Sequence, residues 1–166
     1  MKGAVLQLNI KSRTPGEPGL PKIPVQRIAV SEQGVGGDYN NWRMENAPGD
    51  RDQAVLLMTD EILTQLQREG WPVQPGHMGE NVTLTKIPES ALGPGKRLKI
   101  GDVVLEVSKA CDPCKRLYSL PYVGDERGPD FLRTLVGRRG WYARVLHPGV
   151  IERGASVELM SQQKHS

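Results

Sequence analysis

The chain is poor in aromatic residues and cysteine, and it has no long apolar run. Aromatic residues make up 5% of its 166 residues, with one phenylalanine, so aliphatic side chains must fill most of the core. The two cysteines, Cys111 and Cys114, are too few for a disulfide framework. No apolar run approaches the roughly 18–20 residues that cross a membrane as a helix. These shortages exclude a disulfide-stapled miniprotein and a helical membrane protein.

A strong charge of either sign is also missing. The 22 Lys and Arg residues against 19 Asp and Glu residues give a net charge of +3. This mild balance suits an anionic small molecule and does not indicate a nucleic-acid-binding protein. Residues 1–8 resemble a strand rather than a signal peptide, because polar residues interrupt them before any hydrophobic region forms. We therefore expect a cytoplasmic protein that binds neither nucleic acid nor membrane and keeps its thiols reduced.

Glycine and proline are abundant instead. The 19 glycines and 13 prolines make up about 19% of the chain, against about 12% in average composition. Such frequent turn residues break long helices and favour short strands. Strand-like apolar segments lie at residues 3–10, 25–30, 54–58, 81–85, 98–100, 103–109, 141–146 and 156–160. We predict a mainly β protein, a small and mostly antiparallel β-barrel with one or two decorating helices.

Two helix starts can be recognised from capping residues. Thr59 is a suitable N-cap for the first helix. Asp130 is expected to cap a second, short helix that ends at Val136. Residues 1–160 are predicted to form one domain, followed by a polar, frayed tail at residues 161–166.

The strongest chemical signal is the pair Cys111 and Cys114. This Cys-x-x-Cys pair comes directly after the strand expected at residues 103–109, so the thiols lie at a strand end or in the following loop. Lys115 and Arg116 place positive charge beside the second sulfur. Nearby cations favour the thiolate, which is both the nucleophile and a soft metal ligand. Cys114 is therefore the candidate reactive residue.

Three other interpretations of the cysteines stay open. Both could be buried small hydrophobic residues, since cysteine is among the most often buried residue types. A thiol redox pair normally opens a helix in a βαβ unit, which this sequence does not show. A structural zinc site needs four ligands, and beyond the cysteines only the scattered His77, His147 and His165 are available.

Glu80 and Asn81 form a second candidate site. They follow a glycine-framed turn and lie at the mouth of the strand expected at residues 81–85. An asparagine in this place can bind a ligand through both the oxygen and the nitrogen of its amide. The alternative is a turn in which the asparagine caps its own backbone.

Two weaker signals are a glycine-rich run and an arginine. Residues 34–38, which end in Asp38, match neither a dinucleotide fingerprint nor a P-loop, and a plain turn is the alternative. Arg144 shares a strand face with Tyr142. If that face lines the barrel interior, Arg144 is a fixed cation for a phosphate or carboxylate; otherwise it is solvated.

Taken together and in this order, these segments resemble the MOSC domain, named for the C-terminal part of molybdenum cofactor sulfurases. The resemblance runs from about residue 34 to residue 160. Its motifs are Gly-x-Gly-Gly-Asp at residues 34–38, Ala54-Val55-Leu56-Leu57 followed by Glu61, Gly79-Glu80-Asn81-Val82-Thr83, Ile100-Gly101-Asp102, Pro113-Cys114, and Gly140-Trp141-Tyr142-Ala143-Arg144-Val145.

The resemblance implies a barrel that binds a pterin-type molybdenum cofactor. Cys114, which follows a proline as in the family, would either ligate molybdenum or carry a persulfide sulfur. The residues implied to hold the cofactor are Asp38, Glu80, Asn81, Arg116 and Arg144. We expect no pyridoxal phosphate site in this chain, because no segment matches the sulfurase domain of larger relatives.

The expected function is therefore that of a sulfur carrier or a small molybdenum-dependent oxidoreductase. Its partners would be the molybdenum cofactor and either a sulfur-donor desulfurase or a redox partner. One alternative is a non-catalytic binding or scaffold module that keeps the barrel. Another is a thiol redox or zinc protein that uses both Cys111 and Cys114.

Overall fold

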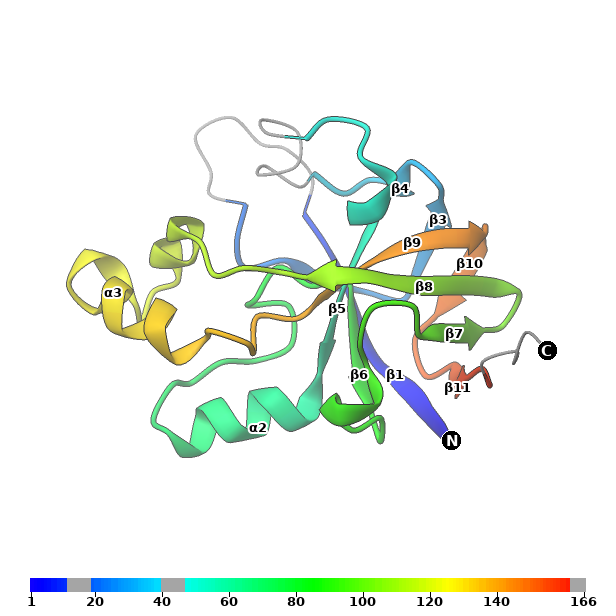
Figure 1. The fold of residues 1–166 in the computed structure, drawn as a ribbon. Helices are drawn as coiled ribbons and strands as arrows, with labels where there is room; N and C mark the ends of the chain where they lie inside the picture. Colours follow the sequence, from blue (N-terminus) through cyan, green and yellow to red (C-terminus); the bar gives the residue numbers. More distant parts are fainter. Residues whose placement is uncertain (12–18, 40–46, 162–166) are drawn as a thin grey trace.

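The computed structural model describes residues 1–11, 19–39 and 47–161 (Figure 1). The strands are β1 (Lys2–Ile10), β2 (Ile23–Val25), β3 (Arg27–Ser31), β4 (Gly34–Val35), β5 (Val55–Thr59), β6 (Val82–Thr85), β7 (Arg97–Ile100), β8 (Val103–Ala110), β9 (Trp141–His147), β10 (Gly149–Glu152) and β11 (Ser156–Leu159). The helices are α2 (Asp60–Arg68), α3 (Gly124–Thr134) and the short 3-10 helices η1 (Arg51–Gln53), η2 (Glu89–Ala91) and η3 (Lys115–Ser119). Residues 162–166 of the predicted tail lie outside the described residues.

Seven strands close into a barrel. Their order is β11-β7-β8-β9-β5-β6-β1, and β1 pairs with β11 to complete the ring. Neighbouring strands are antiparallel except β5 and β6, which are parallel because α2 connects them. Strand β2 adds to the far half of β1, and β10, β3 and β4 form a small second sheet. The predicted mainly β, mostly antiparallel barrel with one or two decorating helices is confirmed, and the described residues hold two α-helices.

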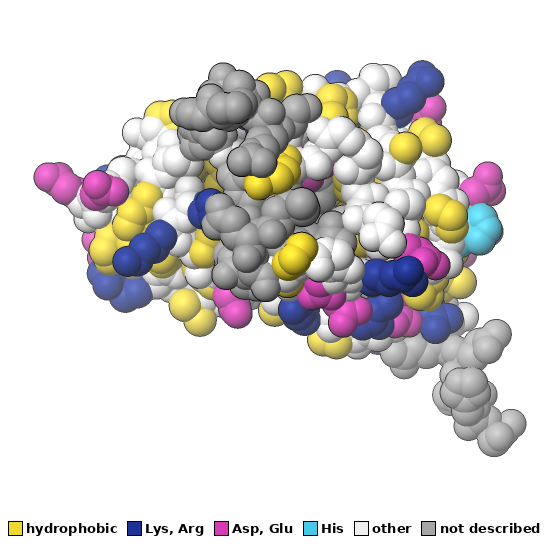
Figure 2. Space-filling view, turned by 90° about the horizontal axis from the view of Figure 1, so that it is seen from above, with side chains coloured by type: hydrophobic (Ala, Val, Ile, Leu, Met, Phe, Trp, Pro, Cys, Tyr) yellow, Lys and Arg dark blue, Asp and Glu magenta, His cyan; other side chains and the backbone are white. Residues whose placement is uncertain are grey.

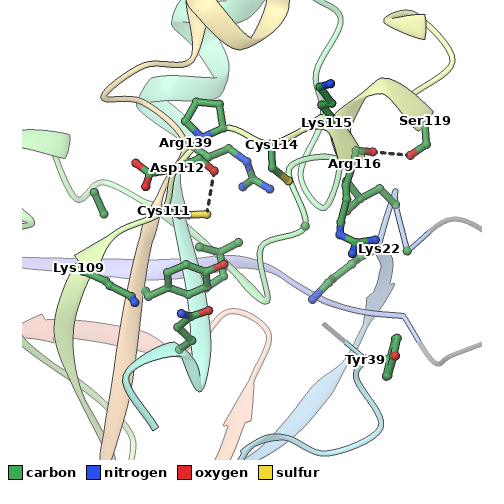
Figure 3. Close-up of a pocket in the computed structure, with 18 residues that line it drawn as sticks. Lys22, Tyr39, Lys109, Cys111, Asp112, Cys114, Lys115, Arg116, Ser119 and Arg139 are labelled. Carbon is green, nitrogen blue, oxygen red and sulfur yellow. Dashed lines mark hydrogen bonds between the residues drawn. The ribbon is translucent and has the colours of Figure 1, made fainter. Parts of the chain in front are cut away.

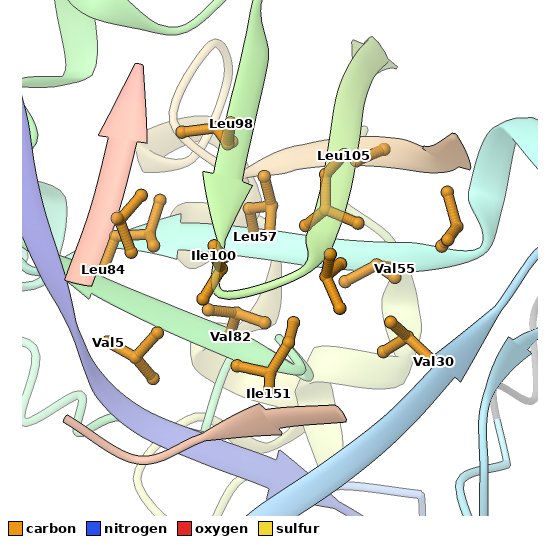
Figure 4. Close-up of a cluster of buried hydrophobic side chains, with 14 of the residues drawn as sticks. Val5, Val30, Val55, Leu57, Val82, Leu84, Leu98, Ile100, Leu105 and Ile151 are labelled. Carbon is orange, nitrogen blue, oxygen red and sulfur yellow. The ribbon is translucent and has the colours of Figure 1, made fainter. Parts of the chain in front are cut away.

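Aliphatic side chains fill the barrel, as the low aromatic content requires. Val5, Leu57 and Leu105 are almost completely buried, and each points into the interior from a different strand (Figure 4). Val30 and Ile151 of the small sheet belong to the same cluster. Burying one such side chain contributes roughly 1.5–3 kcal/mol, so this cluster is a major source of the barrel's stability.

The helices cover a second apolar cluster beside the barrel. Helix α2 begins where the sequence predicted, because the Thr59 hydroxyl accepts a hydrogen bond of 3.4 Å from the Ile62 N–H. Phe131 of α3 is fully buried, and its ring centroid lies 4.6 Å from that of Trp71. Neither helix is long, and none in the described ranges is long and apolar enough to span a membrane.

Two local predictions were wrong. The strand expected at residues 25–30 is two strands in different sheets, because β2 pairs with β1 whereas β3 pairs with β10. The second helix begins at Gly124, so Asp130 is inside it and does not cap it. The helix continues through Pro129 because its buried face, with Gly128 against the ring of Tyr118, packs on η3. These tertiary contacts thus outweigh the tendency of Pro129 to interrupt a helix.

Candidate functional site

A cavity of about 610 Å³ lies beside the barrel, at the place where the chain leaves β8. Its residues come from segments far apart in the sequence, as Figure 3 shows. They are Gly19, Leu20, Lys22, Tyr39, Gln53, Leu56, Gly79, Lys109, Ala110, Cys111, Asp112, Pro113, Cys114, Lys115, Arg116, Ser119, Arg139 and Tyr142.

Three adjacent strands build one wall of this cavity. Tyr142 of β9 pairs in register with Lys109 of β8 on one side and with Leu56 of β5 on the other. Leu56, Tyr142 and Cys111 are at least nine-tenths buried and form one small apolar cluster. Since side chains alternate along β9, Ala143 points into the barrel while Tyr142 points to the cavity.

Both cysteines line the cavity as free thiols, but they differ in exposure. Cys111 is 7% exposed, and its backbone N–H donates to the Gly140 carbonyl at 2.9 Å. Cys114 is partly exposed, and its carbonyl accepts the Leu117 N–H at 3.1 Å, the first bond of η3. The second cysteine is thus the more accessible thiol, and Arg116 lies on the same cavity.

The lining is strongly basic. Five lysine or arginine side chains face one aspartate, Asp112. In the view of Figure 3 the Arg139 side chain lies between Cys111 and Cys114. Arg139 is 6% exposed, and its Nε and Nη1 atoms have no hydrogen-bond partner in the described part of the chain. A buried guanidinium with unsatisfied donors is costly on its own and is stabilised by an anion.

Asp38 and Asn81 lie behind the lining and position Lys22. The Lys22 Nζ donates to Asp38 Oδ2 at 2.6 Å, and both side chains are more than nine-tenths buried. The same aspartate accepts the Lys11 backbone N–H and the Asn81 Nδ2, each at 2.9 Å. Gly37, with a φ of +77°, makes the turn that brings Asp38 there. The lysine on the lining is therefore held by a buried carboxylate.

The amide of Asn81 is fully engaged within the protein. Its Oδ1 accepts the Leu56 N–H at 3.1 Å, and its Nδ2 also donates to the Asn9 carbonyl at 3.3 Å. Asn81 therefore ties β5 and β1 together at the start of β6. It neither caps its own turn nor lines the cavity.

Glu80 is completely buried and also lies off the cavity lining. Its carboxylate accepts the Gly76 N–H at 3.0 Å and the Thr83 hydroxyl at 2.8 Å. Burial raises the pKa of Glu80, although these two hydrogen bonds and the charge of Arg139 act in the opposite direction. Through these hydrogen bonds Glu80 stabilises the turn that leads into β6.

Arg144 points to the outside of the barrel and is not part of the cavity lining. Its Nε donates to Asp52 Oδ1 at 2.9 Å, and its Nη1 contacts Glu106. Of the two alternatives for Arg144, the one in which its strand face lines the barrel interior is wrong, since Ala143 and Val145 take that side. On the face shown in Figure 2, Lys and Arg side chains lie next to Asp and Glu side chains along one edge.

The structure therefore brings Cys114 and Arg116 together and places Asp38, Glu80, Asn81 and Arg144 off the lining. Sequence reasoning missed Lys22, Gln53 and Arg139. The only signal was for Arg139, which lies in a Gly-Arg-Arg-Gly loop before β9. Within the described ranges no group of three or more His, Cys, Asp and Glu residues is placed to hold a metal ion, so the zinc alternative lacks a ligand set there.

Fold and site together define a small β-barrel domain with a basic, cysteine-bearing cavity at its side. The sequence matches the MOSC domain over residues 36–158. The chain belongs to the MOSC domain family.

Known relatives fit this assignment. The chain is 34% identical over 143 residues to a protein named Reductase from Gibberella moniliformis, covering 81% of this chain and 24% of that protein. It thus spans about a quarter of the fungal protein. It is 28% identical over 160 residues to Protein YiiM from Escherichia coli, covering 92% of this chain and 69% of that protein.

Two solved structures are similar in fold. YiiM from Geobacillus stearothermophilus has a TM-score of 0.71 and 28% identity, covering 96% of this chain and 75% of that one. The YuaD protein from Bacillus subtilis has a TM-score of 0.78 at 19% identity and covers 98% of each chain, which shows a likeness of fold.

Proposed function

We propose that this MOSC domain binds a pterin-type molybdenum cofactor in the cavity, with the Cys114 sulfur as the protein ligand of molybdenum, and acts as a small oxidoreductase. The observation that supports this most is the buried Arg139, which lines the same cavity as the partly exposed Cys114 and has unsatisfied Nε and Nη1 atoms. The cavity therefore offers an anion site and a soft ligand together.

The cavity's size and chemistry fit such a group. A volume of about 610 Å³ falls within the roughly 300–1,000 Å³ typical of small-molecule and cofactor sites. The cofactor's phosphate needs cations, and Arg139 and Arg116 supply them. Thiolate sulfur is a soft donor, which suits a metal of this kind. The apolar side chains of Leu56 and Tyr142 offer a flat wall to a planar ring.

The protein's residues would act as follows. Arg139 and Arg116 would bind the anionic end of the cofactor, whereas the Lys22 ammonium is paired with the buried Asp38. Cys114 would present its sulfur from the fixed start of η3, and the thiolate is the form of cysteine that binds a metal. When bound, the molybdenum centre supplies the redox chemistry. The reductase name of the fungal relative favours this activity over pure binding.

A second candidate is sulfur transfer, and the partial exposure of Cys114 favours it. The Cys114 thiolate would attack the outer sulfur of a donor persulfide, and the donor thiolate would leave, so that Cys114 carries the sulfane sulfur. A desulfurase would be the donor in this case, whereas an oxidoreductase needs a redox partner. These partners, and a cytoplasmic location, stay predictions.

Elemental analysis of the reconstituted protein tests the proposal. The wild type is incubated with the molybdenum cofactor, desalted, and analysed for molybdenum; C114S and C111S are treated identically. We expect bound molybdenum in the wild type and in C111S, and its loss in C114S, because Cys111 is buried while Cys114 is accessible.

Intact-mass analysis of the same samples separates the other functions. A mass gain of one sulfur atom on Cys114 after incubation with a desulfurase, without bound molybdenum, would replace the oxidoreductase by the sulfur carrier. Loss of molybdenum only in C111S would make Cys111, and not Cys114, the ligand. Binding that none of the cysteine variants changes would leave a non-catalytic binding module.

A further inference from the structure

Gln53 has a buried acceptor atom that the protein leaves unused. The residue is 3% exposed, lines the cavity, and its Oε1 has no hydrogen-bond partner in the described ranges. A carbonyl oxygen removed from water without a partner costs free energy, which a ligand donor would recover. Among the lining side chains the only other buried atoms without partners are the two nitrogens of Arg139.

The position of Gln53 is fixed by the turn that carries it. Asp50 is the N-cap of helix η1, and its carboxylate accepts the Asp52 N–H at 2.9 Å. Ser108 of β8 donates its hydroxyl to the Asp52 carbonyl, and Arg144 of β9 binds the Asp52 carboxylate. Because two barrel strands hold the turn, the backbone that carries Gln53 is fixed, and its side chain is buried at the cavity.

The two unpartnered groups have opposite requirements. Arg139 offers N–H donors and positive charge, so it selects an anion. Gln53 Oε1 is an acceptor, so it selects an N–H or O–H donor. The cavity is therefore complementary to a ligand that has an anionic group and a separate hydrogen-bond donor. A pterin with a phosphate-bearing side chain has both, since its ring carries an exocyclic amino group.

We propose that Gln53 is a specificity residue for the ligand's ring: its Oε1 accepts a hydrogen bond from the pterin amino group while Arg139 binds the phosphate. This assignment rests on the proposed function, because it presumes a pterin ligand. Replacing the amino group by an oxo group removes the donor and turns an acceptor toward Gln53. The pocket should therefore discriminate between these two ring types.

Calorimetric titration with two metal-free probes tests this. The probes are neopterin monophosphate and its lumazine counterpart, in which an oxo group replaces the amino group. We expect the wild type to bind the pterin about 10-fold more tightly, the effect of one hydrogen bond to a buried group. Q53M, which keeps the length of the side chain but lacks the acceptor, should bind both probes equally.

Two further variants keep the test interpretable. Q53E retains an acceptor and should retain the preference, even if Q53M is poorly folded. R139Q should weaken both probes alike and leave their ratio unchanged. Equal wild-type affinities, or a preference that survives in Q53M, would overturn the role of Gln53 and leave the cofactor proposal standing. Failure of the wild type to bind either probe would overturn both.

Discussion

Arg144 and Arg139 are five residues apart in the sequence but have opposite surroundings. On the outer face of the barrel, Arg97 and Arg144 contact Glu106, and Arg144 also contacts Asp52, so both cations are paired. At the cavity, Arg139 is buried and two of its nitrogens are unpaired. An arginine whose N–H donors are already paired within the protein contributes to surface structure. An arginine with unpaired N–H donors is available to a ligand.

Gly140 supports the cavity arginine, and its replacement gives the largest expected effect. Its φ is +100°, and an added Cβ would lie 2.6 Å from the Leu57 carbonyl oxygen. We expect G140A to lower the free energy of unfolding by about 3 kcal/mol through strain and overpacking. Urea unfolding measures this.

Gly137, at the other end of the same loop, is the matched control. It also has a positive φ, of +77°, but an added Cβ meets nothing within 4 Å. G137A should therefore cost only about 1 kcal/mol. Equal losses for the two variants would mean that the contact with β5 does not hold the loop.

The arginine comparison predicts a difference in ligand affinity. R139Q removes an unsatisfied, buried cation and should weaken binding of neopterin monophosphate about 10-fold. R144Q removes a cation that is already paired outside the cavity and should change the affinity less than twofold. Calorimetry of both folded variants tests this; similar losses would remove the distinction on which the cavity assignment depends.

The two regions also predict opposite pH effects from two glutamates. Burial raises the pKa of Glu80 above its ordinary value of 4.5, so the folded state holds the proton more tightly than the unfolded chain. The contribution of Glu80 to stability therefore falls as the pH rises above its pKa in the unfolded chain. The stability of E80Q relative to the wild type should rise from about pH 4 toward neutrality.

Glu106 on the outer face should behave the other way. The hydrogen bond from Arg97, helped by Arg144, lowers the pKa of Glu106. Its contribution to stability is present when the pH is above the pKa of Glu106 in the unfolded chain. It is lost as the pH falls through the lower pKa of the folded state. The stability of E106Q relative to the wild type should therefore rise as the solution is acidified. Urea unfolding at several pH values tests both signs, and the same slope for both variants would contradict the comparison.

The smallest expected effect is the loss of the outer ion pairs. R144Q should lower the free energy of unfolding by about 0.5 kcal/mol, since exposed pairs contribute little. Because Arg144 and its partners are partly solvated, salt should reduce the difference further. Unfolding at low and high ionic strength measures it, and a loss unaffected by salt would indicate a packing role for the side chain instead.

Local features of the sequence were enough for much of the fold. Frequent glycine and proline with short apolar segments predicted the barrel, and Thr59 predicted the start of α2. The local pattern failed at residues 25–30, where one apolar run serves two sheets. It also failed at Asp130, because contacts with η3 extend α3 past the expected boundary.

By itself the sequence determined the barrel class, the position of α2 and the joint placement of Cys114 and Arg116, since periodicity, caps and neighbouring residues are local properties. The tertiary structure alone decided which polar groups stay unsatisfied. Asn81 and Asp38 form hydrogen bonds with β1, β5 and Lys22. Gln53 and Arg139, in contrast, have buried side-chain atoms without a hydrogen-bond partner among the described residues. The physical reason is that a side chain's partners come from strands and loops distant in sequence, so its availability to a ligand is settled only when the chain has folded.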